Sequence, residues 1–187
     1  MKTSFILRRA VQALLPATLL LAACSKKDDP VTPTPVVDSG KINFYHTAAS
    51  ANVNLKFLVD DVEKANIAYG QNAGYQTFNT GGRAIKINVA STGSTANSQS
   101  VVVEKDKNYS FFAYASSPTA VSGLLVTDDL AIPAASVGKA RIRLVNLGLG
   151  ASTPANLSTV VAGISPIAGT DAACAGYSSF VDIIPGQ

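Results

Sequence analysis

Hydrophobic and polar residues alternate along most of the chain after residue 40, which is the pattern of half-buried β-strands. The clearest alternating runs are Ile42 to His46, Val53 to Val59 and Ile85 to Val89. Other β-rich runs follow; they are Asn66 to Tyr69, Tyr75 to Asn79, Gln99 to Val103, Tyr109 to Ala115 and Gly123 to Thr127. No segment after residue 40 keeps helical spacing over several turns. The pattern therefore predicts an all-β sandwich that begins at Lys41, with one layer of side chains buried between two sheets.

Turn-forming residues separate the predicted strands. We expect turns at Asp60-Asp61 and at Gly81-Gly82, and a long polar loop from Ser91 to Ser100. Without a tryptophan in the chain, the core must consist of aliphatic residues, phenylalanine and tyrosine.

Residues 139–187 repeat features of the first domain. Three matches occur in order: Lys41 to His46 with Arg141 to Asn146, Tyr75 to Phe78 with Tyr177 to Phe180, and Gly82 with Gly186. We therefore expect a partial second sandwich at the C-terminus. This segment either belongs to a truncated gene product or packs as an additional unit against the first domain. The alternative is that it is a complete small subdomain.

The N-terminus has the features of an export signal. Lys2, Arg8 and Arg9 precede the apolar run Ala10–Leu21, and small residues follow it. The ending Leu21-Ala22-Ala23-Cys24 resembles the lipobox of bacterial lipoproteins, which implies that residues 1–23 are a signal peptide and that Cys24 carries acyl chains such as palmitate. Two or more acyl chains anchor a protein stably to a membrane. The alternative is an ordinary secretory leader with a coincidental cysteine.

The residues after the cysteine suggest where the anchored protein goes. Ser25, Lys26, Lys27, Asp28 and Asp29 resemble the surface-export signal of Gram-negative bacteria that are rich in surface lipoproteins. A solvated polar spacer is the other interpretation. Pro30, Pro33 and Pro35 favour an extended tether over the rest of residues 24–40. We expect an outer-membrane protein, lipid-anchored and exposed at the cell surface.

Loss of the leader changes the charge balance. Removing Lys2, Arg8 and Arg9 from the 15 basic residues leaves 12, which equals the 12 acidic residues. A neutral mature chain offers no electrostatic basis for nucleic-acid binding, so we expect no nucleic-acid partner. Lipidation of Cys24 leaves Cys174 without a disulfide partner, and we expect Cys174 to be a small apolar filler.

The chain has few residues that support catalysis. His46 is the single histidine, so neither a multi-histidine metal site nor a histidine acid/base pair is possible, and we expect it to bond loop backbone. Asp60-Asp61 and Asp128-Asp129 could hold calcium, although acidic pairs at turns are usually solvated. We expect no enzyme activity, no cofactor and no metal.

Aromatic residues offer one possible binding surface. Tyrosine rings stack on sugars or bind protein surfaces; the candidates are Tyr45, Tyr69, Tyr75, Tyr109 and Tyr114. In the run Tyr109 to Ala115, Phe112 and Tyr114 share one face, whereas Tyr109 and Phe111 share the other. Some of these rings must therefore belong to the core, and we expect this of at least half of them.

Several of these segments together resemble the DUF4397 domain. They are Ile42 to Ser50, Val53 to Asp60, Tyr75 to Phe78 and the pair Gly81-Gly82. The resemblance covers residues 41–135 once and 139–187 in part. It departs from the family pattern in the absence of proline after Ser50, in Lys56 within the second strand, and in Asn146 at the place of the corner histidine. It implies tandem immunoglobulin-like sandwiches on bacterial surfaces and no activity.

Two functions follow as expectations. The first is a non-catalytic surface module, bound to the membrane through its lipid, that serves adhesion or interactions within the envelope or matrix. The second is a glycan-binding accessory lipoprotein of an outer-membrane uptake system.

Overall fold

The computed structural model of the chain describes residues 37–150, 152–159 and 165–185, all within the unit Val36–Gln187. Cys24, the segment Ser25 to Asp29 and most of the predicted tether lie outside these residues. In the described part, no helix has the length and apolar character needed to cross a membrane.

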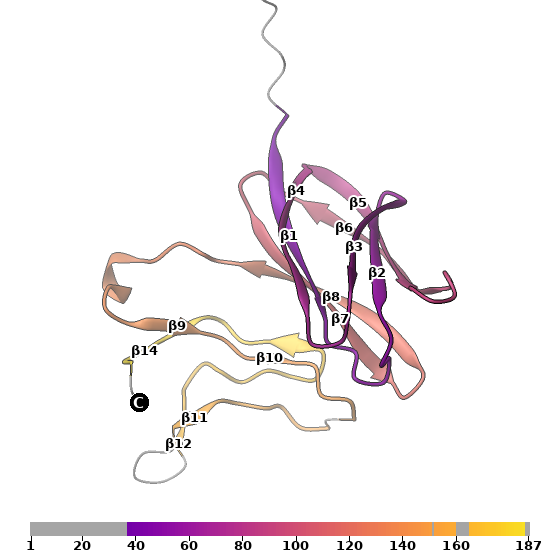
Figure 1. The fold of residues 1–187 in the computed structure, drawn as a ribbon. Helices are drawn as coiled ribbons and strands as arrows, with labels where there is room; N and C mark the ends of the chain where they lie inside the picture. The colour runs from indigo at the N-terminus through magenta and orange to yellow at the C-terminus, as the bar shows by residue number, and fades with distance from the viewer. Residues whose placement is uncertain (1–36, 151, 160–164, 186–187) are drawn as a thin grey trace, which may run out of the picture. The chain divides into compact units, whose positions relative to one another are not determined.

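Residues 39–128 form two four-stranded sheets (Figure 1). The strands are β1 (Ser39–His46), β2 (Leu55–Val59), β3 (Val62–Ile67), β4 (Asn72–Asn79), β5 (Gly81–Val89), β6 (Thr95–Val103), β7 (Asn108–Ser117) and β8 (Ala120–Asp128). Sheet A has the order β4-β1-β7-β8, and sheet B has the order β3-β2-β5-β6. All pairs are antiparallel except β1 with β7, which is parallel. The predicted all-β sandwich is confirmed.

The core lies between the two sheets and is built from alternate residues of each strand. Phe44 of β1 is at its centre, with ring centroids 5.2 Å from Phe57, 6.1 Å from Phe78 and 6.0 Å from Phe111. These four rings come from both sheets, and aliphatic residues such as Ile85 and Ile87 of β5 complete the layer. Burial of this apolar surface is the main stabilising contribution to the sandwich.

Two predicted turns are in fact strand. Gly81 and Gly82 pair with Val103 and Val102 of β6, so the predicted turn is the beginning of β5, which runs from Gly81 to Val89. β6 begins at Thr95, within the predicted loop Ser91 to Ser100. Its polar side chains are mostly exposed because β6 is an edge strand of sheet B, and its backbone ladder with β5 holds it extended without apolar burial.

The described residues between 134 and 183 form short elements. They are a 3₁₀ turn η1 (Ala134–Ser136) and the strands β9 (Ala140–Ile142), β10 (Val145–Asn146), β11 (Ser158–Thr159), β12 (Ser165–Pro166), β13 (Gly176–Tyr177) and β14 (Val181–Ile183). The strands form three antiparallel pairs: β9 with β14, β10 with β13, and β11 with β12. Among the described residues, each of these strands pairs with one neighbour only.

Candidate functional site

The outer face of sheet A carries aromatic side chains from three strands. Tyr45 of β1 and Phe112 of β7 are register partners, and their rings stack with centroids 4.8 Å apart and an interplanar angle of 22°. Tyr114 follows Phe112 on the same face of β7, and Tyr75 comes from β4. We call these four residues, Tyr45, Tyr75, Phe112 and Tyr114, the aromatic face.

Tyr109 and Tyr69 lie elsewhere. Tyr109 is buried in the core, where its hydroxyl accepts a hydrogen bond from the Glu104 backbone N–H at 3.1 Å. Tyr69 is exposed beyond the end of β3 and meets His46 edge to face at 5.8 Å. Of the five predicted tyrosines, the structure thus brings Tyr45, Tyr75 and Tyr114 onto one surface.

A buried carboxylate lies beside the aromatic face. Asp128, at the end of β8, is 6% exposed, and its Oδ2 accepts hydrogen bonds from Tyr75 Oη at 2.6 Å and from Ser110 Oγ at 2.7 Å. Its Oδ1 forms an ion pair with Arg143, whose guanidinium also donates to the Thr127 carbonyl at 2.8 Å. Burial and the neighbouring Asp128 carboxylate raise the pKa of Tyr75 well above its usual range. The prediction that acidic pairs at turns are solvated is wrong for Asp128, because three donors replace water around it.

Asn43 places an unusual polar group beneath the same face. Its side chain is 5% exposed, and its Nδ2 donates to Tyr45 Oη at 2.9 Å. Within the described residues its Oδ1 has no hydrogen-bond partner. A buried acceptor without a donor costs free energy.

An irregularity in the β1–β4 ladder lies next to Asn43. Asn43 pairs with Tyr75 and Tyr45 pairs with Asn72, so two residues of β4, Ala73 and Gly74, lie opposite the single residue between them in β1. Gly74 has a φ of 74°, which glycine adopts without strain, and its N–H donates to Asn72 Oδ1 at 3.1 Å. Bulges of this kind redirect side chains and are frequent beside binding sites.

His46 ends β1 at a buried corner. The Ala48 N–H donates to His46 Nδ1 at 3.4 Å, so the proton resides on Nε2, which donates to the Val53 carbonyl at 2.9 Å. The prediction that His46 bonds loop backbone is confirmed. Burial lowers the pKa of His46.

The other candidate residues have structural partners. Asp60 and Asp61 form a turn with positive φ at both residues, and they make ion pairs with Arg83 and Lys86. In the part of the chain that the structure describes, no three acidic, histidine or cysteine side chains gather as a metal site would require. Cys174 is exposed rather than buried, because it lies in the turn before Ala175, and the prediction of an apolar filler is wrong.

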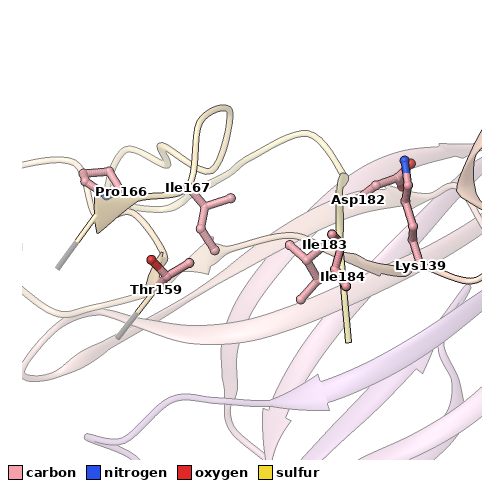
Figure 2. Close-up of a pocket in the computed structure, with 7 residues that line it drawn as sticks. All are labelled: Lys139, Thr159, Pro166, Ile167, Asp182, Ile183 and Ile184. Atoms are coloured by element: carbon pink, nitrogen blue, oxygen red, sulfur yellow. The ribbon is translucent and has the colours of Figure 1, made fainter. Parts of the chain in front are cut away.

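A second surface feature is a pocket of about 410 Å³ in the C-terminal segment (Figure 2). Three isoleucines, Ile167, Ile183 and Ile184, line it together with Thr159, Pro166, Lys139 and Asp182. In Figure 2, Thr159 and Ile167 lie on one side of the pocket, and Ile183 and Ile184 lie on the other. The described lining is mainly aliphatic.

Sequence reasoning missed Asn43, Ser110 and Arg143, and it considered Asp128 only as a calcium ligand or a solvated acid. The alternation in β1 and β7 would have placed Asn43 and Ser110 on the same faces as Tyr45 and Phe112. The residues that surround Asp128 and Arg143 in the sequence do not indicate that the two form an ion pair. The pair depends on how the chain after β8 returns to sheet A.

Comparison with known families gives one result. The model described as Domain of unknown function (DUF4397) matches residues 32–153. The match extends past the predicted domain boundary at residue 135. No curated protein matches the chain.

Proposed function

The chain belongs to the DUF4397 family, and on that premise we propose that it is a lipid-anchored, non-catalytic interaction module of the bacterial cell surface. In this proposal Cys24 carries the lipid, Ser25 to Asp29 direct the protein to the outer leaflet of the outer membrane, and the Pro-rich tether holds the sandwich away from the lipid. The module serves adhesion or contacts within the envelope or matrix.

The aromatic face is the observation that supports the binding role. Tyr45 and Phe112 stack on β1 and β7, the two inner strands of sheet A, so the rings are held in place before any partner arrives. Preorganised aromatic side chains lose little conformational entropy on binding, which is why they are frequent in recognition surfaces. The buried Asn43 beneath them donates from Nδ2 to the Tyr45 hydroxyl at 2.9 Å and so helps to fix that ring.

The binding role is tested by adhesion. Cells that display the wild-type protein should adhere to a matrix-coated surface more strongly than cells that display the Tyr45→Ala/Phe112→Ala variant. Val102→Ala is the matched control, because Val102 is exposed on the edge strand of sheet B, away from the aromatic face. Equal adhesion of wild type and the double variant, at equal surface amounts, would reject an interaction through this face.

The anchor is tested separately by fatty-acid labelling. Cys24→Ser should abolish incorporation of labelled palmitate, whereas Cys174→Ser should leave it unchanged. Labelling that persists in Cys24→Ser would overturn the lipoprotein assignment.

A glycan-binding accessory role is the second candidate. It is supported by the same rings, because Tyr45, Tyr75 and Tyr114 combine flat apolar surfaces with hydroxyl groups, as sugar rings require. A glycan array probed with the purified chain should show binding that Tyr45→Ala removes. Absence of binding to every polysaccharide on the array would exclude this candidate and leave adhesion.

We also propose that residues 139–187 repeat the first part of the sandwich. β9 and β10 pair with β14 and β13 as β1 pairs with β4, and the hairpin β11–β12 corresponds to β2–β3. The corner is similar too: the Gly148 N–H donates to Asn146 Oδ1 at 3.2 Å, as the Ala48 N–H donates to His46 Nδ1.

The repeat departs from the sequence alignment in register. Val145 pairs with Tyr177, whereas Tyr45 pairs with Asn72. With Tyr75 aligned to Tyr177, the partner strand of the second ladder is therefore displaced by three residues relative to the first ladder. Phe180 consequently does not take the core position of Phe78. It instead packs against Arg141 and Arg143, whose guanidinium carbons lie 5.1 and 4.6 Å from its ring centroid.

Exchange of the corner residues tests the repeat. Asn146→His and His46→Asn should be tolerated, because each replacement supplies an acceptor that the other corner already uses. Asn146→Ala should destabilise the segment by about 1 kcal/mol or more, since the Gly148 N–H loses its partner. Limited proteolysis of residues 139–185 reports the effect, and equal sensitivity of Asn146→His and Asn146→Ala would contradict the correspondence.

A further inference from the structure

The side chain of His46 holds both ends of residues 48–53, which lie between β1 and β2 and which we call the corner segment. The ring is fully buried; its Nδ1 accepts a hydrogen bond from the Ala48 N–H at 3.4 Å, and its Nε2 donates to the Val53 carbonyl at 2.9 Å. The remaining hydrogen bond that the structure describes in the segment is internal, from the Ala51 N–H to the Ala48 carbonyl at 3.0 Å. Both hydrogen-bonded attachments of the corner segment therefore depend on one imidazole.

The groups that face this imidazole are neutral. Tyr69, in the turn before β4, meets the ring edge to face at 5.8 Å and is the one titratable side chain that the described contacts place against it. The same turn contributes the Gln71 carbonyl, which accepts the His46 backbone N–H at 3.0 Å, and β7 contributes Ala113, the register partner of His46. Burial is the main cause that lowers the pKa of His46. The protonation of the ring is thus decided by burial and by neutral backbone groups.

A proton on Nδ1 is incompatible with the hydrogen bond from Ala48. In neutral His46, Nδ1 is an acceptor and Nε2 is a donor, whereas both nitrogens are donors in the imidazolium form. The bond from Nε2 to the Val53 carbonyl therefore persists after protonation. The Ala48 N–H, by contrast, loses its acceptor and lies against a second N–H. A hydrogen bond with the Ala51 backbone favours the protonated ring, so the same segment contains a partner for the new donor.

We propose that His46 is a pH switch for the corner segment: the neutral ring holds the Ala48 end of the segment closed, and protonation of the ring opens it. Val53 stays attached in both states, so the change is a local opening of residues 48–51 within a folded sandwich. Because burial lowers the pKa of His46 below its ordinary value of 6.5, the segment is closed at neutral pH and opens in acid. The switch does not depend on the proposed lipid anchor or on adhesion.

The opening changes the surface at this end of the sandwich. Ala48 is fully buried, whereas Val53 and Tyr69 are 43% and 49% exposed. Release of the Ala48 end brings its methyl group toward the surface that carries these two side chains. Any partner that binds this end of the protein therefore meets a different surface in acid than at neutral pH.

A second corner of the chain has the same bonding pattern without a titratable group. Asn146 ends β10; its Oδ1 accepts a hydrogen bond from the Gly148 N–H at 3.2 Å, and its Nδ2 donates to the Ala172 carbonyl at 3.1 Å. An amide side chain supplies an acceptor and a donor at every pH in the physiological range. The Asn146 corner should therefore stay closed where the His46 corner opens. This comparison uses the observed hydrogen bonds alone, so it holds whether or not the two corners are copies of a repeat.

Nuclear magnetic resonance of the isotope-labelled full chain in detergent tests the switch between about pH 7.5 and pH 4. The imidazole signals report the titration of His46 without ambiguity, because it is the single histidine of the chain. As His46 gains its proton, the hydrogen-exchange protection factor of the Ala48 amide should fall about tenfold, the effect of losing one hydrogen bond. The amides of Gly148 and of core residues such as Phe111 should keep their protection.

His46→Asn is the matched variant, because asparagine offers Ala48 an acceptor that does not titrate, as Asn146 does for Gly148. Its Ala48 amide should have the same protection factor at both ends of the pH range. Three results would overturn the switch: an Ala48 amide that ignores the titration of His46, the same loss of protection in His46→Asn, or an imidazole that stays neutral down to about pH 4. Simultaneous loss of protection at Ala48 and Phe111 would also overturn it, since the acid transition would then be global unfolding.

Discussion

The hydroxyl of Tyr75 donates a hydrogen bond to the carboxylate of Asp128 across the outer face of sheet A, at 2.6 Å. Tyr75 belongs to β4 and Asp128 to β8, which are the two edge strands of that sheet, and β1 and β7 lie between them. A single side chain therefore links both edges. The residues beneath it, Asn43 and Ser110, are register partners and are both buried.

Removal of the Tyr75 hydroxyl should destabilise the domain. Tyr75→Phe keeps the ring but leaves Asp128 with one fewer donor, so the free energy of unfolding should fall by about 1.5–3 kcal/mol, the value for a hydrogen bond to a charged group. Urea unfolding measures this change. Tyr69→Phe is the control, because Tyr69 is exposed and should change stability by less than about 0.5 kcal/mol. Equal losses for the two variants would show that the Asp128 bond contributes nothing.

The ion pair between Asp128 and Arg143 should behave as a buried pair. The two side chains are 4% and 11% exposed, so Asp128→Asn leaves a guanidinium without its counter-charge and should cost about 3 kcal/mol. Arg143→Met should lower the free energy of unfolding by a similar amount, because it leaves the buried Asp128 carboxylate without its counter-charge. The double variant should lose less than the sum of both, and a thermodynamic cycle from urea unfolding measures the difference. Strict additivity would mean that the two charges do not interact.

His46 should make stability depend on pH. Burial lowers its pKa below the ordinary value of 6.5, so the unfolded chain binds a proton at a pH where the folded chain does not. The contribution of neutral His46 is therefore fully present above pH 6.5 and is lost as the pH falls through the folded-state pKa. Denaturant unfolding between about pH 8 and pH 5 should show declining stability, and His46→Asn should remove the decline.

Asp60 does not obscure this measurement. The backbone hydrogen bond from Ala84 lowers its pKa, so its contribution to stability is lost at still lower pH, below about pH 4. A wild-type decline between pH 8 and pH 5 that persists in His46→Asn would refute the role of the buried imidazole.

Gly123 of β8 should not accept a side chain. A Cβ there would lie 2.5 Å from Phe111 Cζ and 2.7 Å from Gln99 Oε1, and Phe111 is fully buried. Gly123→Ala should therefore destabilise the domain by about 1–3 kcal/mol through overpacking, as measured by thermal unfolding. Gly82→Ala is the matched control, because no atom lies within 4 Å of its Cβ position. A stable Gly123→Ala variant would mean that the ring moves aside without cost.

The alternation of side chains predicted the sandwich because it records which face of a strand is buried. Ile42, Phe44 and His46 alternate with Asn43 and Tyr45, and the first three face the core. The same signal fails at the start of β6, where Thr95 and Ser98 are exposed and only the backbone ladder holds the strand. Strand ends at a sheet edge carry little information in their side chains.

The candidate site was predicted only in part, for a different reason. Tyr45 and Tyr75 stood out as aromatic residues, but the sequence did not indicate that β1 and β7 are parallel neighbours, which is what brings Tyr45 onto Phe112. Asp128 resembled any acidic residue at a turn. Its burial depends on Tyr75, Ser110 and Arg143, which are distant in sequence, and such contacts follow from topology rather than from local pattern.

The parallel pairing of β1 with β7 also constrains the order in which the domain forms. Lys41 to His46 pair with Asn108 to Ala113, so β1 gains its second neighbour only after most of the domain has become available. Contacts so distant in sequence require closure of a long loop and form slowly. During folding, a chain that has formed the β1–β4 and β2–β5 ladders still exposes the inner edge of β1. An unpaired strand edge is a template for pairing with another chain, so the domain is most prone to aggregation in that interval.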